Sequence, residues 1–575
     1  MKTISISQQI WPLGIRRGSQ MLDEPQTRST TGTIAPSTIR ALLGKPLLGW
    51  AVVAFLLLCA LASVLGTVAG LINFRDVGYP DSSDLLRIRE VVQSGIIYPD
   101  GDRPPYLVSL YGPLTYVLLS IPYRLGVAAG ITPQVFIRLG VVLAVSLCVF
   151  LVYLISKRLY GSKPVALLCA LFAVSAVPLG QWTTQIRGDF LGLSLALLSF
   201  YLFISSRRRA QLIAAAFSAG LAPLCKQTFI AAPVAILVWL IYKRRYQDAA
   251  LWALSFGLTL AVGYGIVMWH EPLMMKSVTV MHHPVLEYTR AFAIILDAVE
   301  QVVTPFAAVG ALAILGRRER DRLPLLVYCV AAWLLAILII PQAGGTINYF
   351  WEPLFVSAVL AGPGLHELQR RVIQVPAVAT AIVLVLLFWS FVPLLRDQLA
   401  NLNLSRTNLS EYHPRKEKWE SFVSIVSGHR LLSTSSDVSL LSTMPEMPDP
   451  FLNGSLELKG GWDSKPIAAQ IDAGVYDLII TNDQEADKHQ DDYRGVRKWS
   501  EGMWSALKRT YGPACVLADD KYAEKFGNEG AEEVWLPRHG AHDILPRLLA
   551  IGCVPLAQPI ETDTVNSAQF RLNSR

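Results

Sequence analysis

The sequence predicts a mostly α-helical bundle that crosses a membrane about eleven times and is followed by a small soluble α/β domain. The first observation is composition: 52% of the 575 residues are hydrophobic and only 17% are charged, against about 25% charged residues in a soluble globular protein. The second is a series of apolar runs, several near the length of about 20 residues that a helix needs to cross a bilayer. The third is that these runs stop at residue 395, where the composition becomes that of a soluble domain.

The chain accordingly divides into three segments. Residues 1–46 are rich in Ser, Thr and Arg, which is typical of a disordered cytoplasmic tail. The apolar run after them is too long and too far from the start for a cleaved signal peptide, so it is expected to remain as an anchor. Residues 47–395 form a transmembrane module with a long outer loop at 74–135, and residues 396–575 form the soluble domain. The candidate spans lie near 47–73, 136–156, 164–181, 188–204, 210–225, 228–242, 249–269, 291–315, 323–341, 351–364 and 374–395.

Clusters of Lys and Arg indicate which ends of the spans face the cytoplasm, because cytoplasmic loops carry an excess of positive charge. All the clusters here can be cytoplasmic together only if residues 112–130 do not cross the membrane. That segment holds Pro113, Pro122 and Arg124, and we interpret it as an interfacial or re-entrant helix. The alternative is a true span, which would place several basic clusters outside. The interfacial interpretation predicts a multi-pass protein of the cytoplasmic (inner) membrane whose C-terminal domain is extracytoplasmic.

The net charge of +7 would suggest a nucleic-acid partner in a soluble protein. Here the basic residues lie in short clusters between apolar runs, so they are explained as membrane loops and no nucleic acid is expected. Five of the seven cysteines lie in or beside apolar runs and are interpreted as small core residues. Cys515 and Cys553 lie in the soluble domain, where one disulfide could form, although no spacing indicates it.

The soluble domain shows short apolar runs separated by amphipathic stretches. The runs at 478–480, 515–517 and 534–536 predict buried strands, and residues 499–509 predict a helix. No catalytic motif and no phosphate-binding glycine loop is visible in this domain. Its expected role is to dock an acceptor or to cover a site in the membrane module.

Three carboxylates open the first outer loop. Asp76, Asp81 and Asp84 fall within nine residues of one another at the predicted membrane edge, where carboxylates are costly and usually tied to function. One could act as a general base towards an attacking hydroxyl, and the group could also hold a divalent cation. The alternative for a single aspartate is an N-cap of the following helix, which is predicted from residue 85 until Gly95 ends it. Asp84 is well placed for such a cap.

Charged residues also mark the next two outer segments. Arg187 and Asp189 flank a glycine, and Asp189 begins a predicted helix. Asp189 is a second candidate acid, and the alternative is a local ion pair or a charge on a helix dipole. Lys226 follows the span at 210–225 and could bind a lipid phosphate as a point charge. The alternative for Lys226 is snorkelling towards the lipid headgroups.

Two further outer segments supply candidate substrate contacts. His282 and His283 lie in the loop at 270–290, where the spacing to the glutamates is no recognised zinc motif, so phosphate or glycan contact is the interpretation. Asn348, Tyr349 and Glu352 lie near the turn at 342–350. An aromatic belt explains the tyrosine without a function, but it does not explain an intramembrane glutamate.

Together these motifs resemble the GT-C glycosyltransferases, and most closely the family 39 branch of protein O-mannosyltransferases and bacterial aminoarabinose transferases. The acidic loop after the first span and the later stretch from Tyr111 to Tyr116, Tyr-Gly-Pro-Leu-Thr-Tyr, carry the resemblance. Asp189, Lys226 and the Asn-Tyr-Phe turn at 348–350 match further family positions. One departure is that Pro80-Asp81 stands where family members often have Asp-Glu. This departure leaves open which aspartate is the base, and by its distance to Gly95 Asp81 is ranked first, then Asp84, then Asp76.

The resemblance implies transfer of a hexose or pentose from a polyprenyl-phosphate donor to an envelope lipid, glycan or protein acceptor, outside the membrane and with inversion. A cation such as Lys226 or Arg187 would stabilise the phosphate leaving group, and no nucleotide-binding motif is needed or seen. The first alternative is a membrane transporter or lipid flippase, but no convincing internal repeat is visible. The second alternative, a non-catalytic envelope scaffold, would leave the clustered aspartates unexplained.

Overall fold

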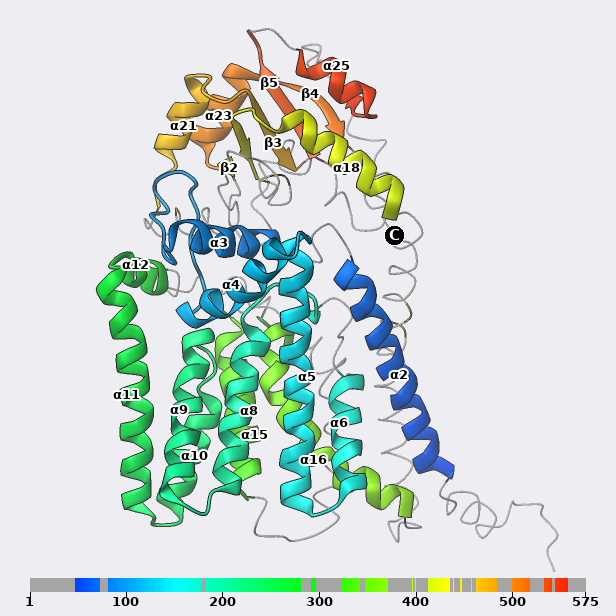
Figure 1. The fold of residues 1–575 in the computed structure, drawn as a ribbon, viewed down its shortest axis with the longest axis vertical. Coiled ribbons are helices and arrows are strands. Elements are labelled where there is room, and N and C mark those ends of the chain that lie inside the picture. Colours follow the sequence, from blue (N-terminus) through cyan, green and yellow to red (C-terminus); the bar gives the residue numbers. More distant parts are fainter. Residues whose placement is uncertain are drawn as a thin grey trace, which may run out of the picture. The chain divides into compact units, whose positions relative to one another are not determined.

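The computed structural model describes the membrane module over residues 47–72, 81–176, 182–280, 291–292, 294–295, 323–341 and 347–370, and the remainder over residues 396, 399, 412–434, 438, 445–446, 457, 462–482, 499–517, 532–539 and 543–556. Helices dominate the membrane module (Figure 1). They are α2 (Leu47–Ile72), α3 (Asp81–Ser94), α4 (Pro113–Ala128), α5 (Pro133–Tyr160), α6 (Lys163–Ala176), α8 (Asp189–Ser205), α9 (Arg209–Cys225), α10 (Ala231–Tyr242), α11 (Tyr246–His270), α12 (Leu273–Val280), α15 (Leu323–Ile339), the 3-10 helix η3 (Ile347–Phe350) and α16 (Trp351–Arg370).

Most of these helices follow the apolar runs of the sequence. By length and composition α2, α5 and α11 can each cross a membrane, and α6, α8, α9, α10, α15 and the start of α16 are shorter apolar helices. Leu254 and Leu258 of α11 are 70% and 59% exposed, which is stable in a lipid environment and costly in water. The prediction of a multi-pass helical membrane protein is confirmed. The spans expected near 291–315 and 374–395 fall almost wholly outside the described residues, so the number eleven stays a prediction.

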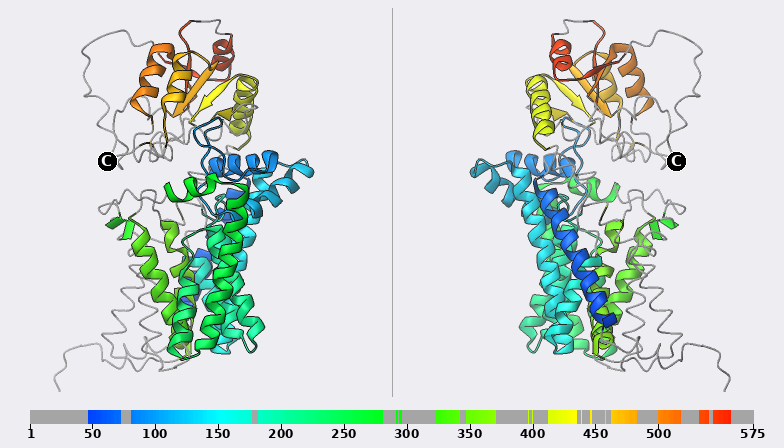
Figure 2. Two further views of the ribbon diagram at one scale, coloured as in Figure 1. Left: turned by 90° about the vertical axis from the view of Figure 1, so that its left-hand side faces the viewer. Right: turned by 90° about the vertical axis from the view of Figure 1, so that its right-hand side faces the viewer.

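Helices α3 and α4 lie across one end of the upright helices α5, α8 and α9 (Figures 1 and 2). Helix α3 begins at Asp81, earlier than expected, and it ends where Gly95 takes a φ of +78°, as predicted. The predicted segment at 112–130 is helical as α4. Pro122 of α4 lies against the position that a Cβ on Gly140 of α5 would occupy, so the two helices pack closely. An interfacial place for α4 agrees with this arrangement and stays a prediction.

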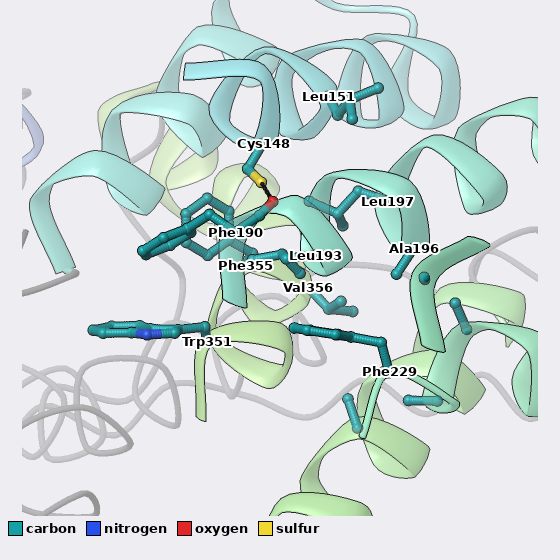
Figure 3. Close-up of a cluster of buried hydrophobic side chains, with 14 of the residues drawn as sticks. Cys148, Leu151, Phe190, Leu193, Ala196, Leu197, Phe229, Trp351, Phe355 and Val356 are labelled. Carbon is teal, nitrogen blue, oxygen red and sulfur yellow. Dashed lines mark hydrogen bonds between the residues drawn. The ribbon is translucent and has the colours of Figure 1, made fainter. Parts of the chain in front are cut away.

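A buried aromatic cluster joins α8 to α16 and to the turn after α9 (Figure 3). Phe190 of α8 stacks on Trp351 of α16, with ring centroids 5.7 Å apart. A Cβ on Gly192 would collide with the ring of Phe229, so the glycine lets this turn approach α8 closely. Asp189 lies three residues before Gly192 and on the same helix face. The packing therefore brings the start of α8 next to the residues that precede Phe229.

The C-terminal domain is built on one mixed six-stranded sheet of order β2-β1-β3-β5-β4-β6. Strands β1, β2 and β3 are parallel, whereas β5 pairs antiparallel with β3 and β4, and β6 pairs antiparallel with β4. One face is covered by α21 and α23 and the other by α18 and α25. The elements are α18 (Tyr412–Val426), β1 (Leu431–Ser433), β2 (Pro445–Glu446), α21 (Lys465–Asp472), β3 (Leu478–Asn482), α23 (Glu501–Thr510), β4 (Tyr511–Leu517), β5 (Glu532–Pro537), α25 (Ile544–Ala550) and β6 (Val554–Pro555). The three predicted strands and the predicted helix are confirmed as β3, β4, β5 and α23.

The cysteines form two groups, five buried in the membrane module and two that are joined in the C-terminal domain. Cys515 and Cys553 form a disulfide across 5.7 Å between their Cα atoms, which sequence spacing alone did not reveal. The other five cysteines are free and buried, which confirms that they are core residues. Because disulfides persist in oxidising compartments and are rare in the cytosol, this one favours an extracytoplasmic place for the domain.

Candidate active site

Asp81 joins α3 to α5 and to the outer turn before α8. Its Oδ2 accepts a hydrogen bond of 2.6 Å from the guanidinium of Arg138, and both side chains are 0% exposed. Its Oδ1 accepts from the backbone N–H of Ile186. Arg138 also donates to the carbonyl oxygen of Gly70, at the end of α2. Asp81 therefore lies where α2, α3, α5 and the turn preceding Arg187 meet.

Asp84 lies one helical turn further along α3. Its Oδ1 accepts from Arg87 at 3.0 Å, and Arg87 also donates to Ser83. The charge of Asp84 acts on both Arg187 and Lys226. Asp84 thus pairs with Arg87, and its charge also contributes to the electrostatic environment of Arg187 and Lys226.

Asp189 is the centre of a buried cluster of charges. It forms a short ion pair with Lys226 and lies 3.2 Å from Arg187, and the side chains of Asp189 and Lys226 are 2% and 7% exposed. The amide of Asn348 donates to the same carboxylate at 3.1 Å. One carboxylate thus contacts two cations, and because Asp84 is paired with Arg87, the cluster keeps a net positive charge. Such a site attracts an anion, since burying a second cation without one is costly.

Aromatic rings surround the two cations. The ammonium of Lys226 lies 4.6 Å from the ring centre of Tyr349 and 5.8 Å from that of Tyr111. The guanidinium of Arg187 donates to the Tyr111 hydroxyl at 3.2 Å and lies 5.3 Å from the ring centre of Trp182. Desolvation by burial raises the pKa of Tyr111 well above that of free tyrosine, so its hydroxyl stays protonated. Burial lowers the pKa of Arg187, but the negative charges of Asp189 and Asp84 and the hydrogen bond to Tyr111 outweigh burial and raise it.

Two glycines explain why the Tyr-Gly-Pro-Leu-Thr-Tyr stretch meets this cluster. A Cβ on Gly112 would collide with the backbone of Leu224, and a Cβ on Gly188 would collide with the hydroxyl of Thr115. The backbone N–H of Gly112 and the hydroxyl of Thr115 both donate to the carbonyl oxygen of Cys225, at 3.0 and 2.8 Å. This close packing holds Tyr111 beside Lys226 and Arg187.

The structure therefore brings most of the candidates from the sequence together. Tyr111, Arg187, Asp189, Lys226, Asn348 and Tyr349 form one cluster, and Asp81 and Asp84 lie at its edge. Snorkelling of Lys226 is wrong, because its side chain is buried against Asp189. Asp76, His282 and His283 lie outside the described residues. Within the described part of the chain no group of three or more metal-binding side chains gathers, so the divalent cation stays a prediction.

Glu352 lies apart from the cluster in the contacts that the structure gives it. It accepts a hydrogen bond from the hydroxyl of Tyr328 at 2.8 Å and a backbone hydrogen bond from Ala232, in the first turn of α10. A carboxylate at that position satisfies a free N–H at the start of a helix. This contact gives a structural reason for the intramembrane glutamate, and its role in substrate binding stays a prediction.

Sequence reasoning missed two arginines that hold the acidic residues. Arg138 lies within a predicted span, and a charge inside an apolar run is the signal that could have found it. Arg87 lies three residues after Asp84, which is the spacing of an ion pair on one helix face.

Comparisons with known proteins show what the chain is similar to. Residues 116–269 match the family model described as dolichyl-phosphate-mannose-protein mannosyltransferase. No curated protein sequence matches the chain. Two crystal structures of ArnT from Cupriavidus metallidurans match, one bound to undecaprenyl phosphate (TM-score 0.56) and one in the apo state (0.53), each at 14% identity and covering 85% of this chain and 98% of that one. The archaeal oligosaccharyltransferase AglB from Archaeoglobus fulgidus gives a TM-score of 0.45 at 13% identity, covering 81% of this chain and 73% of that one.

The match to ArnT covers more of the chain than the membrane module alone, so the likeness of fold extends into the C-terminal domain. It also confirms the GT-C fold that the sequence motifs led us to expect. The chain therefore has the GT-C fold of ArnT, and its residues 116–269 are similar to the dolichyl-phosphate-mannose-protein mannosyltransferases.

Proposed function

We propose that the protein transfers a sugar from a polyprenyl-phosphate donor to a hydroxyl or amine of an envelope lipid, glycan or protein, on the outer side of the membrane. The observation that carries this proposal is the buried cluster in which Lys226 and Arg187 share the single carboxylate of Asp189. Its excess of positive charge fits a phosphate group. ArnT, which has the same fold, was crystallised with undecaprenyl phosphate, which further supports a lipid-linked donor.

The donor phosphate is proposed to bind between Lys226 and Arg187. The protonated hydroxyl of Tyr111 already contacts Arg187 and can donate to a phosphate oxygen as well. Asn348 and Tyr349 line the same place from η3. In the absence of donor, Asp189 partly neutralises both cations, so the cluster can exist in a buried position.

The proposed reaction is a single displacement at the anomeric carbon. The acceptor oxygen or nitrogen forms a bond to that carbon as its bond to the phosphate oxygen breaks, which inverts the anomeric configuration. The electron pair of the broken bond stays with the polyprenyl phosphate, and the cations stabilise the charge that develops there. The proton of the acceptor passes to a carboxylate.

The first turn of α3 offers two carboxylates for that proton, Asp81 and Asp84. Asp81 remains the first candidate, because its carboxylate meets the turn that leads into Arg187. Asp84 remains the second, because its charge acts on both cations of the phosphate site.

Transfer by purified protein tests the proposed function. Membrane lipids and glycans of cells with and without the gene are compared by mass spectrometry, and the sugar that disappears is offered as an isotope-labelled undecaprenyl-phosphate conjugate. We expect the label to appear on the acceptor and free undecaprenyl phosphate to accumulate in equal amount. Movement of the conjugate across vesicle membranes without cleavage of the sugar–phosphate bond would instead favour the flippase alternative.

We also propose that the C-terminal domain is extracytoplasmic and that residues 1–46 are cytoplasmic, as the basic loops and the disulfide indicate. A periplasmic phosphatase fused after residue 575 is expected to be active, and the same enzyme fused within residues 1–46 is expected to be inactive. Activity in the opposite pair of fusions would contradict this topology.

A further inference from the structure

The loop between α3 and α4, residues 95–111, connects three parts of the molecule; we call it the strap. At its start, the carboxylate of Glu271, at the end of α11, accepts hydrogen bonds from the backbone N–H groups of Ile97 and Tyr98. At its end lies Tyr111, whose carbonyl oxygen accepts from the hydroxyl of Tyr98 at 2.9 Å. The strap thus runs directly into the phosphate site.

The middle of the strap is buried in the C-terminal domain. The side chains of Tyr106 and Val108 are 1% and 6% exposed and belong to the core that α21 and α23 form on the sheet. The indole N–H of Trp462 donates to the carbonyl oxygen of Gly101 at 2.9 Å. A Cβ on Gly101 would collide with Val108, so the two limbs of the strap pack directly against each other.

Tyr106 has a backbone φ of +62°, in the left-handed region that residues other than glycine rarely adopt. Such a conformation is strained for a residue with a side chain, and it persists only where surrounding contacts enforce it. Here the tyrosine ring is buried in the core of the C-terminal domain, and its hydroxyl donates a hydrogen bond of 3.4 Å to the side-chain oxygen of Gln470. The shape of the strap therefore depends on the domain that holds it.

The same strap holds the arginine that pairs with Asp84. The guanidinium of Arg87 donates from Nε to the carbonyl oxygen of Val108 at 2.6 Å and from another nitrogen to Asp84 at 3.0 Å. Val108 buries its side chain in the C-terminal domain and presents its carbonyl oxygen to α3. A continuous set of contacts thus joins the aromatic core of that domain to a carboxylate at the edge of the phosphate site.

We infer that the C-terminal domain positions Asp84 for the reaction by holding the strap, with Tyr106 and Arg87 as the positioning residues. This inference rests on the proposed transferase activity. It gives the domain a role in the chemical step, beyond docking an acceptor or covering the site. Misplacing a charge by about 1 Å at a reaction centre can cost about 10²-fold in rate, so release of the strap should lower kcat more than it alters donor binding.

The test compares Tyr106→Ala, Arg87→Lys and their double variant. In Tyr106→Ala the ring that anchors the strap is lost. In Arg87→Lys the single ammonium group can pair with Asp84, but it cannot also reproduce the hydrogen bond that a second guanidinium nitrogen donates to Val108. We expect each single variant to lower kcat by about tenfold or more with the KM for the donor within about twofold. Because both act through one set of contacts, the double variant should be no worse than the poorer single variant.

Two controls separate positioning from general damage. Tyr106→Phe keeps the ring and should restore most of kcat. Trp419→Ala removes a buried aromatic from the separate core on the opposite face of the same sheet, and kcat should stay within about twofold. Additive losses in the double variant, or an equal loss in Trp419→Ala, would overturn the inference.

Hydrogen–deuterium exchange gives a readout that needs no substrate. In Tyr106→Ala the amides of residues 106–109 and of α3 should exchange faster together. The amides of α8 should stay protected, as should those of Leu110 and Tyr111, which donate to the hydroxyl of Tyr116 in α4. If α3 is unaffected, the inference fails even when transfer is intact. If the exchange pattern appears but no donor is ever cleaved, the coupling stands and the proposed function fails.

Discussion

Lys226→Gln is expected to lower kcat/KM for sugar transfer by about 10²–10³-fold, because it removes one of the two cations proposed to bind the donor phosphate. The variant should still fold. Asp189 keeps Arg187 at 3.2 Å and the amide of Asn348 at 3.1 Å, so its carboxylate is not left alone in a buried position. Glutamine is also close to lysine in length and keeps the packing against Tyr349. The loss should therefore appear in substrate binding and turnover rather than in yield.

Binding of undecaprenyl phosphate itself measures this effect without a sugar. Titration of the purified wild-type protein is expected to give saturable binding that weakens at least tenfold in Lys226→Gln and recovers partly in Lys226→Arg, which keeps the charge. Lys243→Gln is the matched control, since Lys243 is an exposed lysine at the other end of α10 that rests on Trp239. Equal binding by wild type and Lys226→Gln would show that the phosphate lies elsewhere.

The membrane fold could be predicted because its signal is local. A run such as 249–269 is apolar over the length of a bilayer, and in the structure it forms α11 with Leu254 and Leu258 exposed. The soluble strands were equally local, since Leu478 to Ile480 is apolar on both faces and lies inside the sheet. The start of α3 was placed too late because Asp81 and Ser83 are poor interior helix residues that are favourable in a first turn.

The sequence indicated most of the individual residues of the site, but not which of them contact one another. Asp189 and Lys226 were each candidate functional residues because charges near the membrane are costly. They are 37 residues apart, however, and no sequence pattern indicates that they form an ion pair. Asn348, which is 159 residues from Asp189, is brought to it only by the packing of η3 and α16 against α8. Two glycines, Gly112 and Gly188, carry the close approach, and only the contacts a Cβ would make reveal this.

Asp81→Asn is expected to lower kcat by about 10²–10⁴-fold, the range that a general base contributes, while donor binding through Lys226 stays within a few-fold. Asn is nearly isosteric and its carbonyl oxygen can still accept from the N–H of Ile186. It removes the negative charge 2.6 Å from the guanidinium of Arg138, however, and breaking a buried ion pair destabilises a protein by about 3–5 kcal/mol. The single variant therefore loses activity whether Asp81 is the base or merely fastens α3 to α5.

The double variant Asp81→Asn with Arg138→Gln separates these two roles. Replacing both partners of a buried ion pair is often close to neutral for stability, because no charge remains uncompensated. If Asp81 only fastens the helices, thermal stability and transfer should recover together. If Asp81 is the base, stability should recover and transfer should remain lost. Recovery of both, together with a loss of about 10²-fold or more in Asp84→Asn, would assign the proton to Asp84, whose charge already acts on the two cations of the phosphate site.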